Sequence, residues 1–146
     1  MIRLLIATVI FVFCAGLAQA QNVDIIEKRK KTFEGIMPQV EVGKKFLKGD
    51  LAFDTAAAKT IFETYAAAAG ELKSMFPEDT KTGGETRALP AIWEKKADFD
   101  ARMAKFETDS RNAADTITDL ASFKTAWGEV MSSCGGCHKP YRAEKK

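Results

Sequence analysis

The residue types best suited to chemistry in this 146-residue chain stand together near its C-terminus. Cys134-Gly135-Gly136-Cys137-His138 follows the pattern C-x-x-C-H, the attachment sequence for c-type haem. On a helix these two thiols and the imidazole share one face. The thiols then reach the two vinyl groups on one porphyrin edge, and the imidazole lies under the iron. The spacing predicts one covalent haem c, with His138 as the metal ligand.

Three other uses of these side chains fit less well. A thioredoxin-type dithiol needs a βαβ setting, which the pattern of this chain lacks. A structural zinc site needs a fourth ligand, and the sequence has no second His. A disulfide across C-x-x-C inside a helix has poor geometry. The third cysteine of the chain, Cys14, lies far away in the N-terminal segment.

That N-terminal segment has the features of an export signal. Arg3 precedes an apolar run from Leu4 to Ala15, and Ala18-Gln19-Ala20 offers small residues where a signal peptidase cuts. The run is shorter than the roughly 20 apolar residues of a membrane span. Residues 1–20 are therefore predicted to be a cleaved signal peptide. Residues 21–146 form the exported domain, with no membrane span after cleavage.

The composition indicates one globular domain with a near-neutral surface. The chain is 46% hydrophobic and 29% charged, which argues against disorder. Lys and Arg number 22 against 20 Asp and Glu, a net charge of +2 that does not favour nucleic acid as a partner.

Helical spacing of apolar residues recurs four times, and no segment alternates as a strand does. The expected helices cover residues 23–48, a segment capped by Asp50 or Asp54, a segment from Trp93 to Ile117, and residues from about Asp119 onward. The one long loop is predicted between Pro77 and Pro90. Four amphipathic helices predict an all-α antiparallel four-helix bundle, with the haem near its C-terminus.

A motif so close to the C-terminus of a helical bundle resembles the cytochrome c′ family (class II c-type cytochromes). The resemblance includes Tyr141-Arg142 after the motif, GGETRALPAIW over residues 83–93, and RKKTF followed by FLKGD in the first helix. It covers essentially the whole predicted mature chain.

The resemblance implies roles for individual residues. Cys134 and Cys137 match the thioether anchors and His138 the proximal ligand, while Arg142 matches a basic residue beside that imidazole. Further matching positions lie near the haem propionates or line the haem edge; these are Arg29, Lys30, Glu85 and Thr86. An arginine suits propionates because guanidinium pairs bidentately with carboxylate.

The sixth coordination position separates two functions. Phe33 matches the family's apolar distal residue; it has no lone pair and so implies five-coordinate, high-spin iron. Met37, one turn further on and followed by Pro38, offers a thioether instead. If Met37 ligates the iron, the protein is a low-spin electron carrier; if it packs in the core, the distal face stays open.

An open apolar iron site favours small diatomic ligands such as NO and CO. Peroxide cleavage, in contrast, requires an acid–base group near the iron. We therefore expect a periplasmic, redox-active haem protein that binds NO and CO and is not an enzyme. Electron transfer to redox partner proteins is the alternative function. The resemblance also implies a homodimer formed through the first two helices. Apolar residues in that region, such as Val42, Phe46 and the 53–57 stretch, equally suit closure of the bundle.

Overall fold

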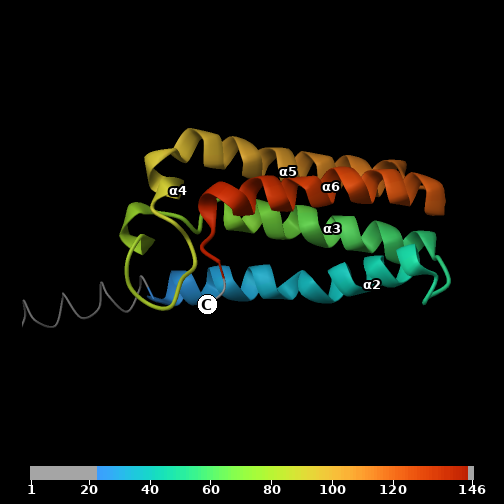
Figure 1. Cartoon of the computed structure of the whole chain (residues 1–146), viewed down its shortest axis with the longest axis horizontal. Coiled ribbons are helices and arrows are strands. Elements are labelled where there is room, and N and C mark those ends of the chain that lie inside the picture. The colour runs from blue at the N-terminus through green and yellow to red at the C-terminus, as the bar shows by residue number, and fades with distance from the viewer. Residues whose placement is uncertain (1–22, 145–146) are drawn as a thin grey trace, which may run out of the picture.

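The computed structural model describes residues 23–144 as an all-α four-helix bundle (Figure 1). The predicted signal peptide, residues 1–20, lies outside the described residues. Helical residues 23–35 are followed by five further α-helices and one 3-10 turn: α2 (Met37–Lys48), α3 (Thr55–Leu72), η1 (Glu78–Thr80), α4 (Ala91–Glu94), α5 (Lys96–Thr116) and α6 (Leu120–Tyr141). The described residues contain no strand, only an isolated bridge between Ala88 and Arg142. The predicted fold class is confirmed.

The first long helix is interrupted at one residue. Ile36 separates helical residues 23–35 from α2, yet its φ of −83° and ψ of −14° remain in the right-handed helical region. Pro38 lies in the first turn of α2 and has no N–H to donate to the preceding turn. The proline therefore breaks the hydrogen-bond ladder at one point while the chain continues along the same side of the bundle (Figure 1).

Side-chain caps set the starts of α3 and α6. Asp54 accepts a 2.7 Å hydrogen bond from the Ala57 N–H, so Asp54 is the N-cap of α3, one of the two candidates in the sequence. Asp119 caps α6 and forms a reciprocal capping box with Ser122. At the other end of α2, Gly49 adopts a left-handed φ of 78°, which a glycine tolerates without strain.

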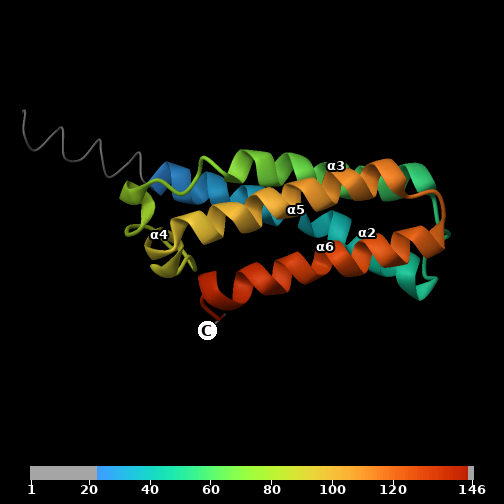
Figure 2. The ribbon, with the colours of Figure 1, turned by 90° about the horizontal axis from the view of Figure 1, so that it is seen from above.

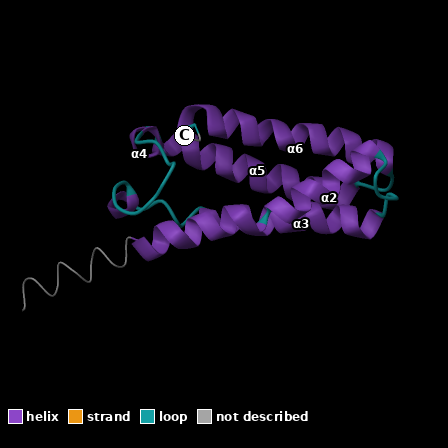
Figure 3. Cartoon of the chain, turned by 60° about the horizontal axis from the view of Figure 1, so that its bottom comes forward, coloured by secondary structure: helices purple, strands orange, loops and turns teal. Residues whose placement is uncertain are grey.

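The third predicted helix is divided in the structure. Lys95, with φ −122° and ψ 42°, leaves helical geometry between α4 and α5. The long loop was predicted between Pro77 and Pro90. In the structure it begins earlier, after α3 ends at Leu72, runs to Pro90 and contains the 3-10 turn η1 (Figure 3). Loop, α4 and the C-terminal residues lie at the same end of the bundle (Figure 1).

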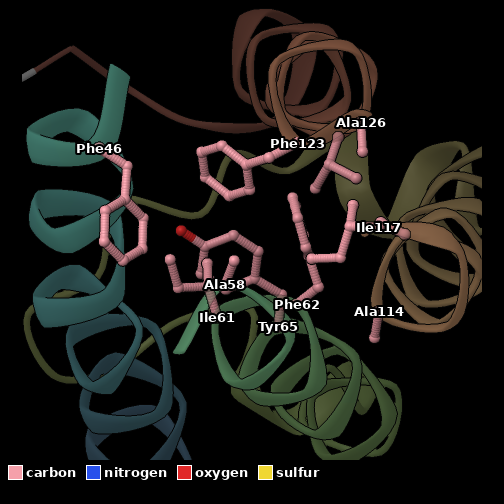
Figure 4. Packing of buried hydrophobic residues seen from close by; sticks show 11 residues of the cluster. Phe46, Ala58, Ile61, Phe62, Tyr65, Ala114, Ile117, Phe123 and Ala126 are labelled. Atoms are coloured by element: carbon pink, nitrogen blue, oxygen red, sulfur yellow. The ribbon is translucent and has the colours of Figure 1, made fainter. Parts of the chain in front are cut away.

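The bundle interior contains two clusters of buried residues. At the end near α4, the α4-end cluster consists of Ala69, Leu72, Met75, Phe76, Ile92, Trp93, Phe99, Met103 and Tyr141. Toward the opposite end lies the far-end cluster, whose side chains Figure 4 shows as sticks: Phe46, Ala58, Ile61, Phe62, Tyr65, Ala113, Ala114, Ile117, Phe123, Ala126 and Val130. Phe106 packs against both clusters. Seen from above, α3 and α5 lie on one side of the bundle and α6 on the other (Figure 2).

The apolar residues of the first two helices take part in this core. Phe46 is buried, and Val42, Phe53 and Ala57 pack against the far-end cluster. These residues therefore help to close the bundle within this chain. No helix among residues 23–144 is both long enough and apolar enough to cross a membrane.

Candidate haem-binding site

The three motif side chains lie on the last turns of α6 and are all half-buried. Both thiols are free, and Cys137 packs against the α4-end cluster. Burial raises the pKa of Cys134 and of Cys137, so both thiols stay protonated at neutral pH. The helix thus carries two free thiols and one imidazole at neighbouring positions.

His138 is held in its neutral form. Burial, with added repulsion from Arg142 and Arg87, lowers the pKa of the His138 imidazole. Arg142 Nη1 lies 3.4 Å from His138 Nε2, and a guanidinium only donates hydrogen bonds. The Nε2 atom therefore carries a lone pair on a neutral ring, which is the form that ligates iron.

The chain beyond α6 is fastened to the long loop. The Ala143 N–H donates to the Arg87 carbonyl at 2.8 Å, and the Leu89 N–H donates to the Tyr141 carbonyl at 3.0 Å. The Tyr141 hydroxyl also donates to the Asp98 carboxylate on α5. These contacts fix the C-terminal residues against the bundle, so Arg142 keeps a defined position near His138 despite its exposed side chain.

Arg29, in the first helix, is the buried cation of the site. Its side chain is 3% exposed, and its guanidinium lies 4.4 Å from the centroid of the Phe76 ring. Nη1 donates to the Met75 carbonyl at 3.0 Å and to Thr80 Oγ1 at 3.4 Å; Nη2 donates to Thr86 Oγ1 at 3.0 Å. The structure therefore brings together two residues that the sequence placed at the haem edge, Arg29 and Thr86.

The charge of Arg29 is not matched by a carboxylate among residues 23–144. Burial lowers the pKa of this guanidinium, which means that the protein environment disfavours the cation. Its hydrogen-bond partners in the described part of the chain are all neutral oxygens. A buried cation of this kind fits an anionic group such as a haem propionate, and a guanidinium is the side chain best shaped for it.

Lys30 and Glu85 do not join the Arg29 network. Lys30 donates a 2.9 Å hydrogen bond to Glu27 on the same helix, which is the main cause of its raised pKa; Glu85 and Glu34 add a smaller effect. Glu85 is exposed on the long loop. The charge of Glu85 adds to the raised pKa of Lys30, and neither side chain is buried.

Phe33 and Met37 face different surroundings. Phe33 is half-buried and packs against the α4-end cluster, the same cluster that Cys137 contacts. Met37 is 50% exposed and belongs to neither cluster. The structure therefore packs Phe33, and not Met37, against the cluster that Cys137 also contacts.

The structure adds residues that sequence reasoning missed. Thr80 is fully buried and Phe76 stacks on the Arg29 guanidinium, although both lie in or next to a segment whose composition predicts only a connection. The helical spacing places Tyr65 in a core stripe, and its hydroxyl is buried without a hydrogen-bond partner among residues 23–144. The sequence signal for this hydroxyl was a tyrosine within an apolar helical stripe whose other members are Ala, Phe, Leu and Met.

Within the described residues, no three His, Cys, Asp or Glu side chains converge to hold a bare metal ion. The motif thus lacks the fourth ligand of a structural zinc site. Two thiols, one neutral imidazole and a buried unpaired cation instead match the parts of covalent haem: vinyl groups, iron and propionate.

Comparisons with known proteins agree with this assignment. A family model described as Cytochrome C' matches residues 24–142. Cytochrome c' of Rhodopseudomonas palustris is 39% identical over 145 residues, covering 98% of this chain and 99% of that protein. Cytochrome c-556 of Agrobacterium fabrum is 37% identical over 137 residues, covering 90% and 88%.

Solved structures show the same fold. The structure of cytochrome c' from Rhodopseudomonas palustris matches with a TM-score of 0.81 at 38% identity, covering 84% of this chain and 98% of that one. A nitric oxide complex of a mutant of cytochrome c prime from Alcaligenes xylosoxidans matches with a TM-score of 0.73 at 25% identity, covering 84% and 97%. On this match of sequence, fold and motif, the chain belongs to the cytochrome c′ family.

Proposed function

We propose that this protein is a periplasmic haem protein whose five-coordinate, high-spin iron binds NO and CO. The observation that carries the proposal is the contrast between two residues one turn apart. Phe33, which has no lone pair, packs against the α4-end cluster, while the thioether of Met37 is 50% exposed. A distal side covered by a phenyl ring leaves the sixth iron position without a protein ligand.

Three residues of α6 would hold the haem. The thiols of Cys134 and Cys137 would add across the two vinyl groups, each forming a C–S bond while the thiol hydrogen goes to the other vinyl carbon. The neutral imidazole of His138 would ligate the iron. The bound group supplies the redox centre and the open coordination position.

Arg29 would anchor the opposite edge of the macrocycle through a propionate. Its present neutral partners, the Met75 carbonyl and two threonine hydroxyls, already fix the guanidinium in place. Positioning is therefore complete before the anion arrives, which lowers the entropic cost of forming the ion pair.

An apolar distal side favours neutral diatomic ligands over charged ones. It also lacks the acid–base group that peroxide cleavage requires, so we propose ligand binding and redox cycling and no catalysed reaction. The likeness to the nitric oxide complex from Alcaligenes xylosoxidans supports NO as a ligand. The proposal has three further parts. The N-terminal signal exports the protein, the haem exchanges electrons with redox partner proteins, and two copies of the chain form a homodimer through their first two helices.

The test is expression in a host that matures c-type cytochromes, followed by NO titration of the ferrous protein. We expect haem to remain attached after denaturation in the wild type and to be lost from the Cys134→Ser/Cys137→Ser double variant. We expect NO to bind the wild type and Met37→Ala alike, because Met37 is exposed. Haem that dissociates on denaturation, or NO binding only in Met37→Ala, would contradict the proposal.

A further inference from the structure

The haem-attachment motif contains a backbone carbonyl that lacks its usual helical donor. Residue 140, inside α6, is a proline and has no N–H. In an α-helix the N–H of that residue would donate to the carbonyl four residues earlier, which is the carbonyl of Gly136. The helix continues past the proline, because the Arg142 N–H donates to the His138 carbonyl at 3.0 Å. One carbonyl in the middle of the motif therefore needs a donor from elsewhere.

Arg102 on α5 supplies this donor. Its Nη1 atom donates a 3.0 Å hydrogen bond to the Gly136 carbonyl, which is 34 positions later in the chain. A hydrogen bond from a charged donor is stronger than one between neutral groups. The guanidinium thus takes the place of the backbone bond that the proline withholds, and it connects α5 to the motif.

Two further side chains hold the guanidinium in place. Arg102 Nε donates to Asp98 Oδ2 at 2.7 Å, one turn earlier on α5, and the Tyr141 hydroxyl donates to the same oxygen. The Tyr141 side chain is 3% exposed, and its ring packs edge-on against Phe99 with centroids 5.3 Å apart. Asp98 is therefore anchored to the α4-end cluster through Tyr141, and it orients Arg102 toward the motif.

Arg111 shows the same pairing without the contact to the motif. It also lies on α5, and its Nη2 donates to Glu107 one turn earlier at 2.8 Å. In the described part of the chain, the hydrogen bond from Arg111 ends on its own helix. An arginine paired in this way on α5 does not by itself reach α6, so the bond from Arg102 to Gly136 is a separate feature of the fold.

We propose that Arg102 is a positioning residue for the haem, which fixes the motif turn by replacing the absent N–H of Pro140. Cys137 and His138 directly follow Gly136. A carbonyl held at Gly136 therefore fixes the peptide that carries the second thiol, and with it the imidazole one residue later. The inference rests on the proposed ligation of the haem iron by His138 and is independent of the open sixth position.

The test records the hyperfine-shifted haem methyl resonances of the ferric haem protein by proton NMR, because their spread depends on the orientation of the imidazole plane. We expect Arg102→Met to change this spread. The Arg102→Met/Pro140→Ala double variant regains a backbone N–H for the Gly136 carbonyl, so its methyl shifts should return to the wild-type pattern. Arg111→Met is the matched control: it removes an arginine with the same pairing from the same helix and should leave the shifts unchanged.

The double variant separates the lost hydrogen bond from the lost charge, because both variants of Arg102 lack the guanidinium. Unchanged methyl shifts in Arg102→Met, or equal changes in the single and the double variant, would overturn the role of Arg102. The methyl signals themselves would in that case still uphold the attached haem. A wild type that carries no covalent haem would overturn both the proposed haem site and the role of Arg102.

Discussion

Arg29 donates a 3.0 Å hydrogen bond to Thr86, 57 positions later in the chain. This contact joins the first helix to the long loop that leads into α4. The same guanidinium donates to the Met75 carbonyl, three residues after the end of α3, so one side chain connects three segments around the proposed propionate site. Arg29 therefore serves both the fold and the ligand, and its removal should affect both.

We predict that Arg29→Met lowers the free energy of unfolding of the haem-loaded protein by about 1–3 kcal/mol, since it leaves a buried carbonyl and two hydroxyls without their donor. Loss of the positive charge also favours ferric over ferrous haem, so the reduction potential should fall. Chemical denaturation and a redox titration measure the two effects.

Lys30→Met is the control for Arg29→Met. Lys30 is the neighbouring cation, but its partner is Glu27 on the same helix and its side chain is 35% exposed. Its removal should therefore cost clearly less stability than the removal of Arg29. Equal effects of the two substitutions on stability and on reduction potential would contradict the special role given to the buried Arg29.

Phe33→Ala should increase the rate of CO binding to the ferrous protein, because it removes the ring that covers the distal side. Met37→Ala, one turn away at a 50% exposed position, should bind CO at the wild-type rate. Flash photolysis gives both rates. An unchanged rate in Phe33→Ala would place the distal cover elsewhere.

Gly43→Ala should destabilise the bundle by about 1–3 kcal/mol through overpacking. A Cβ at Gly43 would lie 2.0 Å from Trp127 Cζ3, so α2 and α6 approach this closely only with glycine there. Gly128→Ala tests the opposite case, since nothing lies within 4 Å of its Cβ position. That substitution should stabilise α6 by about 0.5–1 kcal/mol, and thermal denaturation should therefore move the two variants in opposite directions.

Glu107 should contribute to a loss of stability in acid. Hydrogen bonds from Lys73, the C-cap residue of α3, and then from Arg111 lower the pKa of this carboxyl from its ordinary 4.5. A lowered folded-state pKa gives stability that is present above pH 4.5 and is lost as the pH falls through the folded value. Glu107→Gln should be less stable at pH 7, by up to about 1 kcal/mol, and less sensitive to acid below pH 4.5.

The control for that pH series is Glu63→Gln on the exposed face of α3, where the described residues form no ion pair. Its acid profile should follow the wild type. If Glu107→Gln loses as much stability in acid as the wild type does, the ion pair between Lys73 and Glu107 contributes nothing to the acid sensitivity.

Local signals in the sequence account for much of the fold. Asp54 and Asp119 start helices because their carboxylates accept backbone N–H groups within three residues, which a sequence displays directly. The ladder break before Pro38 follows from its missing N–H. The motif residues of α6 share one face because helix geometry alone fixes their relation.

Features that depend on contacts between residues far apart in the sequence could not be predicted from local sequence signals. Lys95 leaves helical geometry at a position with no glycine or proline to mark it. The need for glycine at position 43 arises from Trp127 on another helix. The unpaired hydroxyl of Tyr65 emerges only when every surrounding helix is in place, since a periodic pattern records burial and not hydrogen-bond partners.

The central claim is that the iron lacks a sixth protein ligand, and an optical spectrum tests it most directly. The purified haem protein is measured in its ferric and ferrous states, before and after addition of CO. The account predicts a broad, unsplit ferrous band that shifts readily with CO. Sharp, split ferrous bands that do not respond to CO would contradict it, because they would mean a sixth ligand from the protein and a low-spin electron carrier.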